Sequence, residues 1–257
     1  MTSTVTYKIE DEIAIVTMNN PPANQFSEAL INDFISAFEH LHEEKLRVVV
    51  LTGTNQFFQA GVDITMLGNV ETKQKGLEFC DVCQKITNLV ATMPCPVIAM
   101  VNGVALGGGS ELIAACDIRV ASKDAKFGLP EVGWGVYPGA GGTKRIPALI
   151  GPGKAKMLMF SGKTLTAEEA LEIGLVDEVV EADSLLDNTM TLATMIARQS
   201  PSAVRGVKMA IDKGLHVSLD EALAIEREGL GELVETGDLL EGSAAFTERR
   251  KPAYEVK

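Results

Sequence analysis

The segment "NGVALGGGSELIAACDI", Asn102 to Ile118, contains the pattern on which the interpretation of the whole chain depends. It follows the apolar stretch "CPVIAMV" (95–101), which is typical of a buried strand, and it continues into an apolar helical run. Three consecutive glycines, Gly107 to Gly109, lose much conformational freedom on folding, so they indicate a turn that needs positive φ or a close backbone approach. One acid, Glu111, stands where the apolar run begins.

The same order of elements occurs in three successive segments: an apolar strand, a turn, a short strand, a glycine and a helix. The segments are "VVVLTGTNQFFQAGVDITML" (48–67), "VIAMVNGVALGGGSELIAAC" (97–116) and "IRVASKDAKFGLPEVGWG" (118–135). Strands that alternate with helices indicate an α/β architecture. Because the repeat is loose, we interpret the three segments as strand–strand–helix turns of a spiral.

Helices are predicted on both sides of these repeats. Residues 27–46 have apolar positions at helical spacing, with Ser27 as the N-cap, and residues 72–92 are also helix-like. From Thr166 onward the chain becomes mainly helical, beginning with a capping box formed by Thr166 and Glu169. This last third is either a helical layer on the core or an interface between subunits.

Composition narrows the classes of function. The chain has 257 residues, which fits one large domain or one domain with an appended region. The net charge of −12, without a Lys/Arg-rich run, argues against nucleic acid as a partner. The N-terminus lacks the pattern of a secretory signal, and no run of eighteen apolar residues predicts a membrane span. Four sparse cysteines fit free thiols in a reducing compartment, so we expect a cytoplasmic protein.

Several common catalytic and binding motifs fail on inspection. The segment "GAGGTK" (139–144) lacks the ending of a phosphate-binding loop, and Ser110 does not lie in a G-x-S-x-G motif. Cys80 and Cys83 form a single C-x-x-C pair within helical sequence, without a second pair or a nearby histidine. We therefore expect core thiols and no metal site.

Two acids, Glu111 and Glu131, follow glycine or proline turns in adjacent repeats. Each alone fits an acid that complements the dipole at the start of a helix. The alternative is catalytic, because a carboxyl group buried beside an apolar helix has a raised pKa, which suits general acid–base chemistry. Glycines at a helix start also let a ligand oxygen reach unpaired N–H groups. Both interpretations stay open on this evidence.

The sequence resembles the crotonase family, the enoyl-CoA hydratase/isomerase superfamily, over nearly its whole length. The matching stretches are "VTMNNPPANQFS" (16–27), "FFQAGVDITML" (57–67), "NGVALGGGSELIAACDIRVAS" (102–122), "FGLPEVGWGVYPGAGGTKRI" (127–146) and "EGSAAFTERRKPAY" (241–254). The resemblance implies a crotonase-like α/β spiral core with the CoA-binding and active site, residues 1–195. It also implies a C-terminal helical trimerisation region, residues 196–257, in a homotrimer or a homohexamer built as a dimer of trimers.

The resemblance further implies an enoyl-CoA hydratase, a hydro-lyase that acts on acyl-CoA thioesters in fatty acid β-oxidation. Such enzymes add water reversibly across the 2,3 double bond and give 3-hydroxyacyl-CoA. The residues that match are Glu111 and Glu131 as the catalytic pair, and the N–H groups of Val62 and Gly108 as the oxyanion hole. No metal and no cofactor beyond the CoA moiety of the substrate is implied.

Resemblance also assigns a CoA and substrate site. Its residues are Asn24, Gln25, Phe26, Ala60, Gly61, Asp63, Ile64, Leu67, Gly107, Trp134, Tyr137 and Gly139. Val62 replaces the alanine that is usual in the family, which a backbone donor tolerates. Trp134 and Tyr137 either shape the acyl pocket or simply pack in the core.

Three other functions stay open at this stage. The same scaffold supports isomerisation of an enoyl-CoA double bond and hydration of a dienoyl-CoA ring, although two acids favour a simple hydratase. A non-catalytic acyl-CoA-binding subunit needs only the oxyanion hole and the CoA groove, so the presence of both glutamates argues against it.

Overall fold

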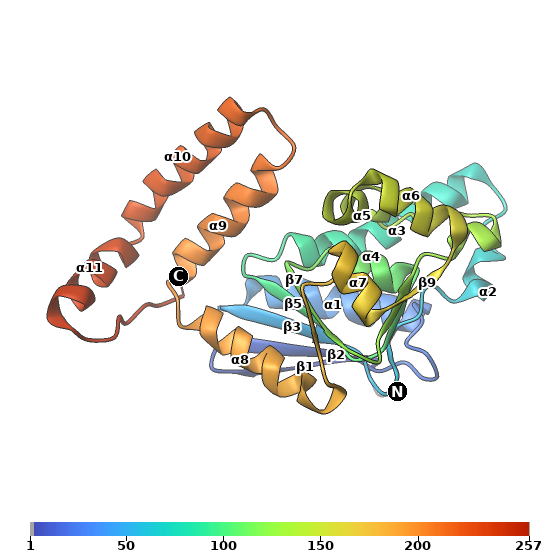
Figure 1. Ribbon diagram of the computed structural model, residues 1–257, viewed down its shortest axis with the longest axis horizontal. Helices are drawn as coiled ribbons and strands as arrows, with labels where there is room; N and C mark the ends of the chain where they lie inside the picture. Colours follow the sequence, from blue (N-terminus) through green and yellow to red (C-terminus); the bar gives the residue numbers. More distant parts are fainter. Residues whose placement is uncertain (1–2, 257) are drawn as a thin grey trace.

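Two β-sheets form the centre of the molecule in a computed structural model, which describes residues 3–256 (Figure 1). The larger sheet has the strand order β1-β2-β3-β5-β7-β10 and the smaller sheet has the order β4-β6-β8-β9. The larger sheet consists of β1 (Val5–Glu10), β2 (Ile13–Met18), β3 (Val48–Thr52), β5 (Val97–Val101), β7 (Ile118–Ser122) and β10 (Glu178–Val180). The smaller one consists of β4 (Phe57–Gln59), β6 (Val104–Leu106), β8 (Lys126–Gly128) and β9 (Thr164–Thr166).

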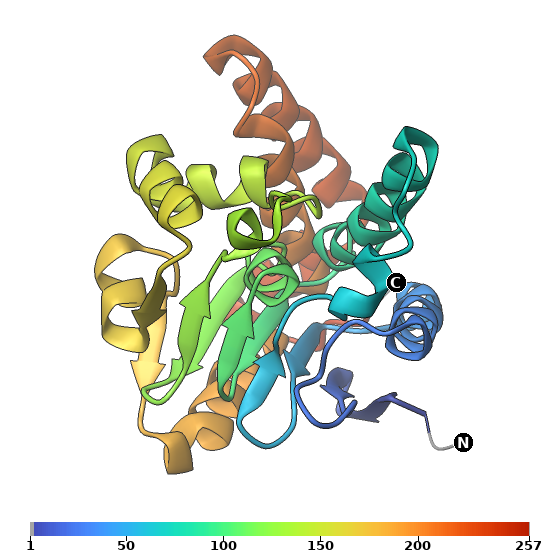
Figure 2. The same cartoon turned by 90° about the vertical axis from the view of Figure 1, so that its right-hand side faces the viewer.

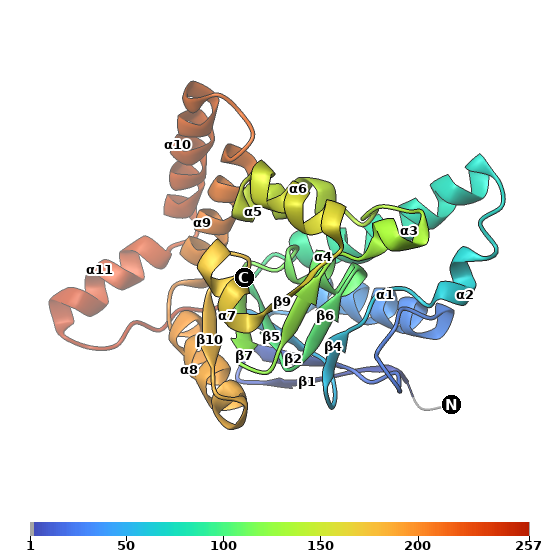
Figure 3. The same ribbon diagram turned by 45° about the vertical axis from the view of Figure 1, so that its right-hand side comes forward.

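The three sequence repeats form three turns of a spiral between these sheets (Figure 3). Each turn places one strand in each sheet and then a short helix: α2 (Ile64–Leu67), α4 (Gly108–Ile113) or the 3-10 helix η1 (Glu131–Trp134). Equivalent strands pair in parallel, β3 with β5 and β5 with β7 in one sheet, and β4 with β6 and β6 with β8 in the other. The predicted strand–strand–helix spiral is therefore confirmed, and the three short helices begin at the same edge of the smaller sheet.

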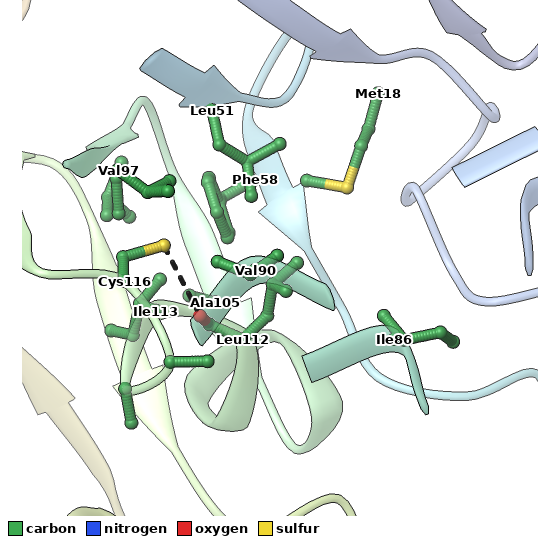
Figure 4. Close-up of a cluster of buried hydrophobic side chains, with 14 of the residues drawn as sticks. Met18, Leu51, Phe58, Ile86, Val90, Val97, Ala105, Leu112, Ile113 and Cys116 are labelled. Atoms are coloured by element: carbon green, nitrogen blue, oxygen red, sulfur yellow. Dashed lines mark hydrogen bonds between the residues drawn. The ribbon is translucent and has the colours of Figure 1, made fainter. Parts of the chain in front are cut away.

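Apolar side chains cover both faces of the larger sheet, which explains why β3 and β5 are continuously apolar. On one face Met18, Leu51, Phe58, Val90 and Leu112 point toward one another from two sheets and two helices (Figure 4). The opposite face packs against helix α8 (Leu185–Ala197).

The remaining helices of the core are α1 (Glu28–Glu43), α3 (Lys73–Ala91), α5 (Gly142–Ile150), α6 (Pro152–Ser161), α7 (Ala167–Ile173) and the 3-10 helix η2 (Ala182–Ser184). Two predicted helix starts are confirmed in atomic detail. Ser27 accepts a hydrogen bond from the Leu30 amide, and Thr166 and Glu169 form a capping box. Within residues 3–256, no helix combines the length and apolar character needed to cross a membrane.

Helices α9 (Pro201–Gly214), α10 (Leu219–Glu235) and α11 (Asp238–Glu248) extend away from the core (Figures 1 and 2). The division drawn from the sequence, between residues 195 and 196, lies in the last turn of α8. An ion pair of 2.5 Å between Lys208 and Asp117 ties α9 to the core. Many apolar side chains of these helices are exposed, including Ile211, Leu230 and Phe246. This region therefore leaves apolar surface uncovered in the single chain.

Candidate active site

The glycine run lies where strand β6 turns into helix α4. Gly107 has φ of 54°, and its amide donates to the Gly128 carbonyl of the neighbouring strand. A Cβ on Gly109 would lie 2.0 Å from the Gln59 carbonyl oxygen, so only glycine fits there. Gly108 is the first residue of α4, and within residues 3–256 no oxygen accepts a hydrogen bond from its amide. The turn therefore presents an open N–H group at the start of a buried helix.

The preceding repeat supplies a second open amide. Gly61, with φ of 88°, follows strand β4 as Gly107 follows β6, and the two glycines lie against each other. The Phe26 amide donates to the Gly61 carbonyl, and the Asp63 amide donates to the Phe26 carbonyl. The amide of Val62 between them has no acceptor among the described residues. Two amides without an acceptor among residues 3–256, at Val62 and Gly108, thus follow positive-φ glycines in adjacent turns of the spiral. Their role as an oxyanion hole stays a prediction.

Glu111 is the buried acid of helix α4, with 4% of its surface exposed. Its Oε1 accepts hydrogen bonds of 2.8 Å from the backbone amides of Ala140 and Gly142. Burial, together with the charge of Glu131, raises the pKa of Glu111 to about 7, although both amides and Arg145 act to lower it. The burial foreseen from the apolar helix is confirmed, and Glu111 can exchange a proton near neutral pH.

Glu131 is the first residue of η1 and its carboxyl group lies against Gly107. Both of its oxygens are buried, and no group in residues 3–256 donates a hydrogen bond to either one. Burial raises the pKa of Glu131 to about 7. The two acids interact electrostatically, so protonating one favours ionisation of the other.

A family model described as "Enoyl-CoA hydratase/isomerase" matches residues 8–257. The chain belongs to the enoyl-CoA hydratase/isomerase family. It is 40% identical over 248 residues to the short-chain-enoyl-CoA hydratase of Clostridium acetobutylicum, with 94% of each chain covered. It is 39% identical over 250 residues to the crotonyl-CoA hydratase of Syntrophomonas wolfei, with 95% of each covered. The crystal structure of an enoyl-CoA hydratase from Bacillus anthracis matches with a TM-score of 0.93 at 36% identity, covering 99% of this chain and 100% of that one.

This membership confirms the resemblance drawn from the motifs, and the structural match confirms the crotonase-like α/β spiral. The loops that carry the expected family residues also meet in space. Phe26 forms a β-bridge with Val62, and its ring lies beside Gly108. The segments around residues 26, 62 and 108 therefore border one site, although they are far apart in the sequence.

Two polar side chains assigned to the CoA site are engaged within the protein. Asn24 is buried, accepts a hydrogen bond of 2.7 Å from the Asn20 amide, and donates one of 2.9 Å to the Phe57 carbonyl. Asp63 caps helix α2 through the Thr65 amide. These side chains therefore shape the loops, and a direct role of either one in binding CoA stays a prediction. The other expected residues of this part, Gln25, Ala60, Ile64 and Leu67, are partly or well exposed.

The loop after Glu131 carries Trp134 and Tyr137, for which the sequence left two interpretations open, an acyl pocket or the core. Trp134 is 61% exposed and Tyr137 is 74% exposed, so the alternative that they pack in the core is wrong, and their contribution to the acyl pocket stays a prediction. η1 is a single short turn that carries both the acid and Trp134, and it leaves the bulky ring outside. Gly139 turns its carbonyl oxygen toward helix α3, where Cys80 and Gln84 donate to it.

Sequence reasoning missed the groups that hold Glu111. The donors lie in "GAGGTK" (139–144), a segment rejected as a phosphate-binding loop and matched to the family without a role for its amides. Its glycines were the available signal, because they mark a loop whose amides can approach another group closely. Arg145, which follows this loop directly, was also overlooked.

Proposed function

We propose that this protein is an enoyl-CoA hydratase, which adds water across the 2,3 double bond of an enoyl-CoA and gives 3-hydroxyacyl-CoA. The observation that carries the proposal is a pair of buried glutamates, unequally hydrogen-bonded, beside two amides without acceptors. The names of the relatives, short-chain-enoyl-CoA hydratase and crotonyl-CoA hydratase, support the same activity. They also favour a short acyl chain.

The thioester carbonyl accepts hydrogen bonds from the amides of Val62 and Gly108. Withdrawal of electrons toward this oxygen makes the β-carbon electrophilic, and the same amides stabilise the enolate that forms. Loss of one such donor lowers the rate of comparable enzymes by about 100- to 1000-fold. Both donors are backbone groups, which explains why Val62 can replace a smaller residue.

Water attacks the β-carbon while its proton passes to Glu111, and Glu131 gives a proton to the α-carbon. The hydrogen-bond donors support this assignment, because two amides of a separate loop hold the carboxylate of Glu111, whereas no other residue among those described donates to the carboxyl group of Glu131. One O–H bond of water, the O–H bond of Glu131 and the π bond of the alkene break, while a C–O bond, a C–H bond and an O–H bond on Glu111 form. Transfer of the gained proton from Glu111 to Glu131 restores the starting state. The pair titrates as a unit, so its apparent pKa values belong to both groups.

The CoA moiety lies along the segments near Phe26 and Ala60–Ile64, where the main chain binds the adenine. The reaction as proposed needs no metal and no cofactor beyond this CoA moiety. Trp134 and Tyr137 border the acyl chain at the exposed loop.

The uncovered apolar surface of α9–α11 supports assembly into a homotrimer or a dimer of trimers. Light scattering coupled to size-exclusion chromatography measures this directly, and a monomer at micromolar concentration would contradict it.

Hydration of crotonyl-CoA, followed by loss of ultraviolet absorbance of the conjugated thioester, tests the activity. We expect turnover by the unaltered protein and a large loss in Glu111→Gln and Glu131→Gln. Enoyl-CoAs of different length, branching and ring content then define the substrate. Conversion of a 3-enoyl-CoA without net hydration would instead identify an isomerase. Full turnover in both variants would exclude the proposed mechanism.

A further inference from the structure

The loop Gly139–Gly142 lies between Glu111 and helix α3 and forms hydrogen bonds to both. Its two amides, from Ala140 and Gly142, hold the Oε1 atom of Glu111. Their orientation depends on what holds the loop from the other side. The carbonyl oxygens on that side point to α3 and to Arg145, a residue with no role so far.

Arg145 lies near the start of α5, and its side chain binds the loop that precedes this helix. Its Nη1 donates to the Ala140 carbonyl and to the Thr87 hydroxyl, each at 3.1 Å, and its Nη2 donates to Asn88 Oδ1 at 2.6 Å. Thr87 also donates to the Ala140 carbonyl at 2.6 Å. The guanidinium group therefore joins the loop to helix α3 through hydrogen bonds from both of its terminal nitrogens.

Gly141 lies directly under the guanidinium group. It has φ of 96°, and a Cβ built on it would lie 2.1 Å from Nη1 of Arg145. A side chain at this position would displace the arginine. Gly141 lies between Ala140 and Gly142, whose amides donate to Glu111. The packing of Arg145 against Gly141 therefore restrains the backbone between these two donors.

Hydrogen bonds to the carbonyl oxygen of Gly139 also strengthen the amide of Ala140 as a donor to Glu111. The Gly139 carbonyl and the Ala140 N–H belong to one peptide group, and the carbonyl accepts from Cys80 Sγ at 3.2 Å and from Gln84 at 3.3 Å. Polarising a carbonyl makes the N–H of the same peptide a better donor. Helix α3 thus acts on Glu111 through the loop without touching its carboxyl group.

Three titratable groups face Glu111 from the surrounding elements: Glu131 of η1, Cys83 of α3 and Arg145 of α5. Burial raises the pKa of Cys83 to about 12, so that thiol is neutral. The charge of Glu131 raises the pKa of Glu111, whereas the charge of Arg145 lowers it. Arg145 is the cation of this set.

We propose that Arg145 is a positioning residue, which clamps the Ala140–Gly142 backbone against helix α3 so that its amides hold Glu111 as the ionised base. This inference rests on the proposed function for its consequence in catalysis. Its structural part, the hold on the Glu111 carboxylate, does not depend on which substrate is used. A merely structural staple between α3 and α5 would contribute to stability alone.

The kinetic test uses Arg145→Met, Arg145→Lys and the matched control Lys144→Met, which removes an exposed charge from the neighbouring position. In Arg145→Met we expect kcat for crotonyl-CoA to fall about 10- to 100-fold, since a base displaced by about 1 Å loses that much rate, with KM little changed. The acidic limb of the kcat–pH profile moves to higher pH by about one unit or more, because loss of the cation favours protonated Glu111. Arg145→Lys recovers part of both effects, and Lys144→Met shows neither.

A second readout is independent of activity. Infrared difference titration follows the protonated carboxyl band, assigned to Glu111 by its loss in Glu111→Gln. We expect the band to persist to higher pH in Arg145→Met than in the unaltered protein. A lower unfolding temperature with unchanged titration and an unchanged pH profile would overturn the proposal. If the unaltered protein does not hydrate enoyl-CoAs, the proposed function fails, while the titration still decides whether Arg145 holds Glu111.

Discussion

The starts of α4 and η1 occupy equivalent places in the spiral but have opposite surroundings. Every residue of α4 is buried, whereas Val132–Tyr137 of the other turn are exposed. Both turns carry an acid whose pKa burial raises to about 7. Glu111 has two amide donors and Glu131 has none among the described residues. The two acids therefore reach similar pKa values from different surroundings, because deeper burial of Glu111 is offset by its amide donors, whereas Glu131 is less buried and has no donor from another described residue.

The largest expected effect is a loss of catalytic rate when Glu131 is replaced. Glu131→Gln should lower kcat for crotonyl-CoA by about 1000-fold, because an amide cannot give a proton to the α-carbon. Stopped-flow or steady-state absorbance measures the rate. Glu172→Gln, which removes an exposed acid of α7, is the control and should retain normal kcat. Loss of less than tenfold in Glu131→Gln would remove this residue from the mechanism.

The next effect is on stability, and it compares the tightly packed turn at α4 with the open turn at η1. Gly109→Ala should lower the free energy of unfolding by about 3 kcal/mol, because its Cβ would overlap the Gln59 carbonyl of another strand. Gly133→Ala in η1 meets no atom within 4 Å and should change it by less than about 0.5 kcal/mol. Urea unfolding measures both values. Equal stability of the two variants would mean that the α4 turn can relax, contrary to its close packing.

A third effect concerns pH and stability. A carboxyl group whose pKa is raised on folding binds its proton more tightly in the native state, so its contribution is complete below pH 4.5 and declines as pH rises through about 7. Glu131→Gln should therefore be more stable than the unaltered protein at pH 8 by about 1 to 3 kcal/mol, and the difference should narrow toward pH 4.5. Glu111→Gln should gain a similar amount over the same pH range, because the pKa of Glu111 is also raised to about 7. Unfolding curves that show no pH-dependent gain in either variant would contradict the raised pKa values.

The smallest expected effect lies at the exposed loop. Trp134→Ala should change the free energy of unfolding by less than about 0.5 kcal/mol, because most of the ring is outside the core. If the ring borders the acyl chain, the ratio of kcat/KM for six-carbon over four-carbon enoyl-CoA should rise about tenfold. Tyr137→Ala provides a second test on the same loop. An unchanged ratio in both variants would place the acyl chain elsewhere.

Several elements were predictable because their causes are local. Apolar residues indicated the strands β3 and β5, and side-chain caps at Ser27 and Thr166 marked two helix starts. The burial of Glu111 followed from the apolar residues after it. The position of Trp134 was not predictable in this way, because an aromatic residue in a glycine-rich loop has no periodic pattern that assigns it to a face.

Local sequence thus specified the strands, the caps, the glycines that allow left-handed turns and the presence of two acids. The proton affinities of those acids depended on the folded chain, because the donors to Glu111 lie 29 and 31 residues away and reach it only when α5 packs beside α4. The backbone amides of a loop cannot be recognised from the side chains in the sequence. The position of Arg145 depends on hydrogen bonds to α3, which form only in the folded chain. Hydrogen bonding to a buried carboxylate is a property of three-dimensional proximity, and spacing along the chain does not encode it.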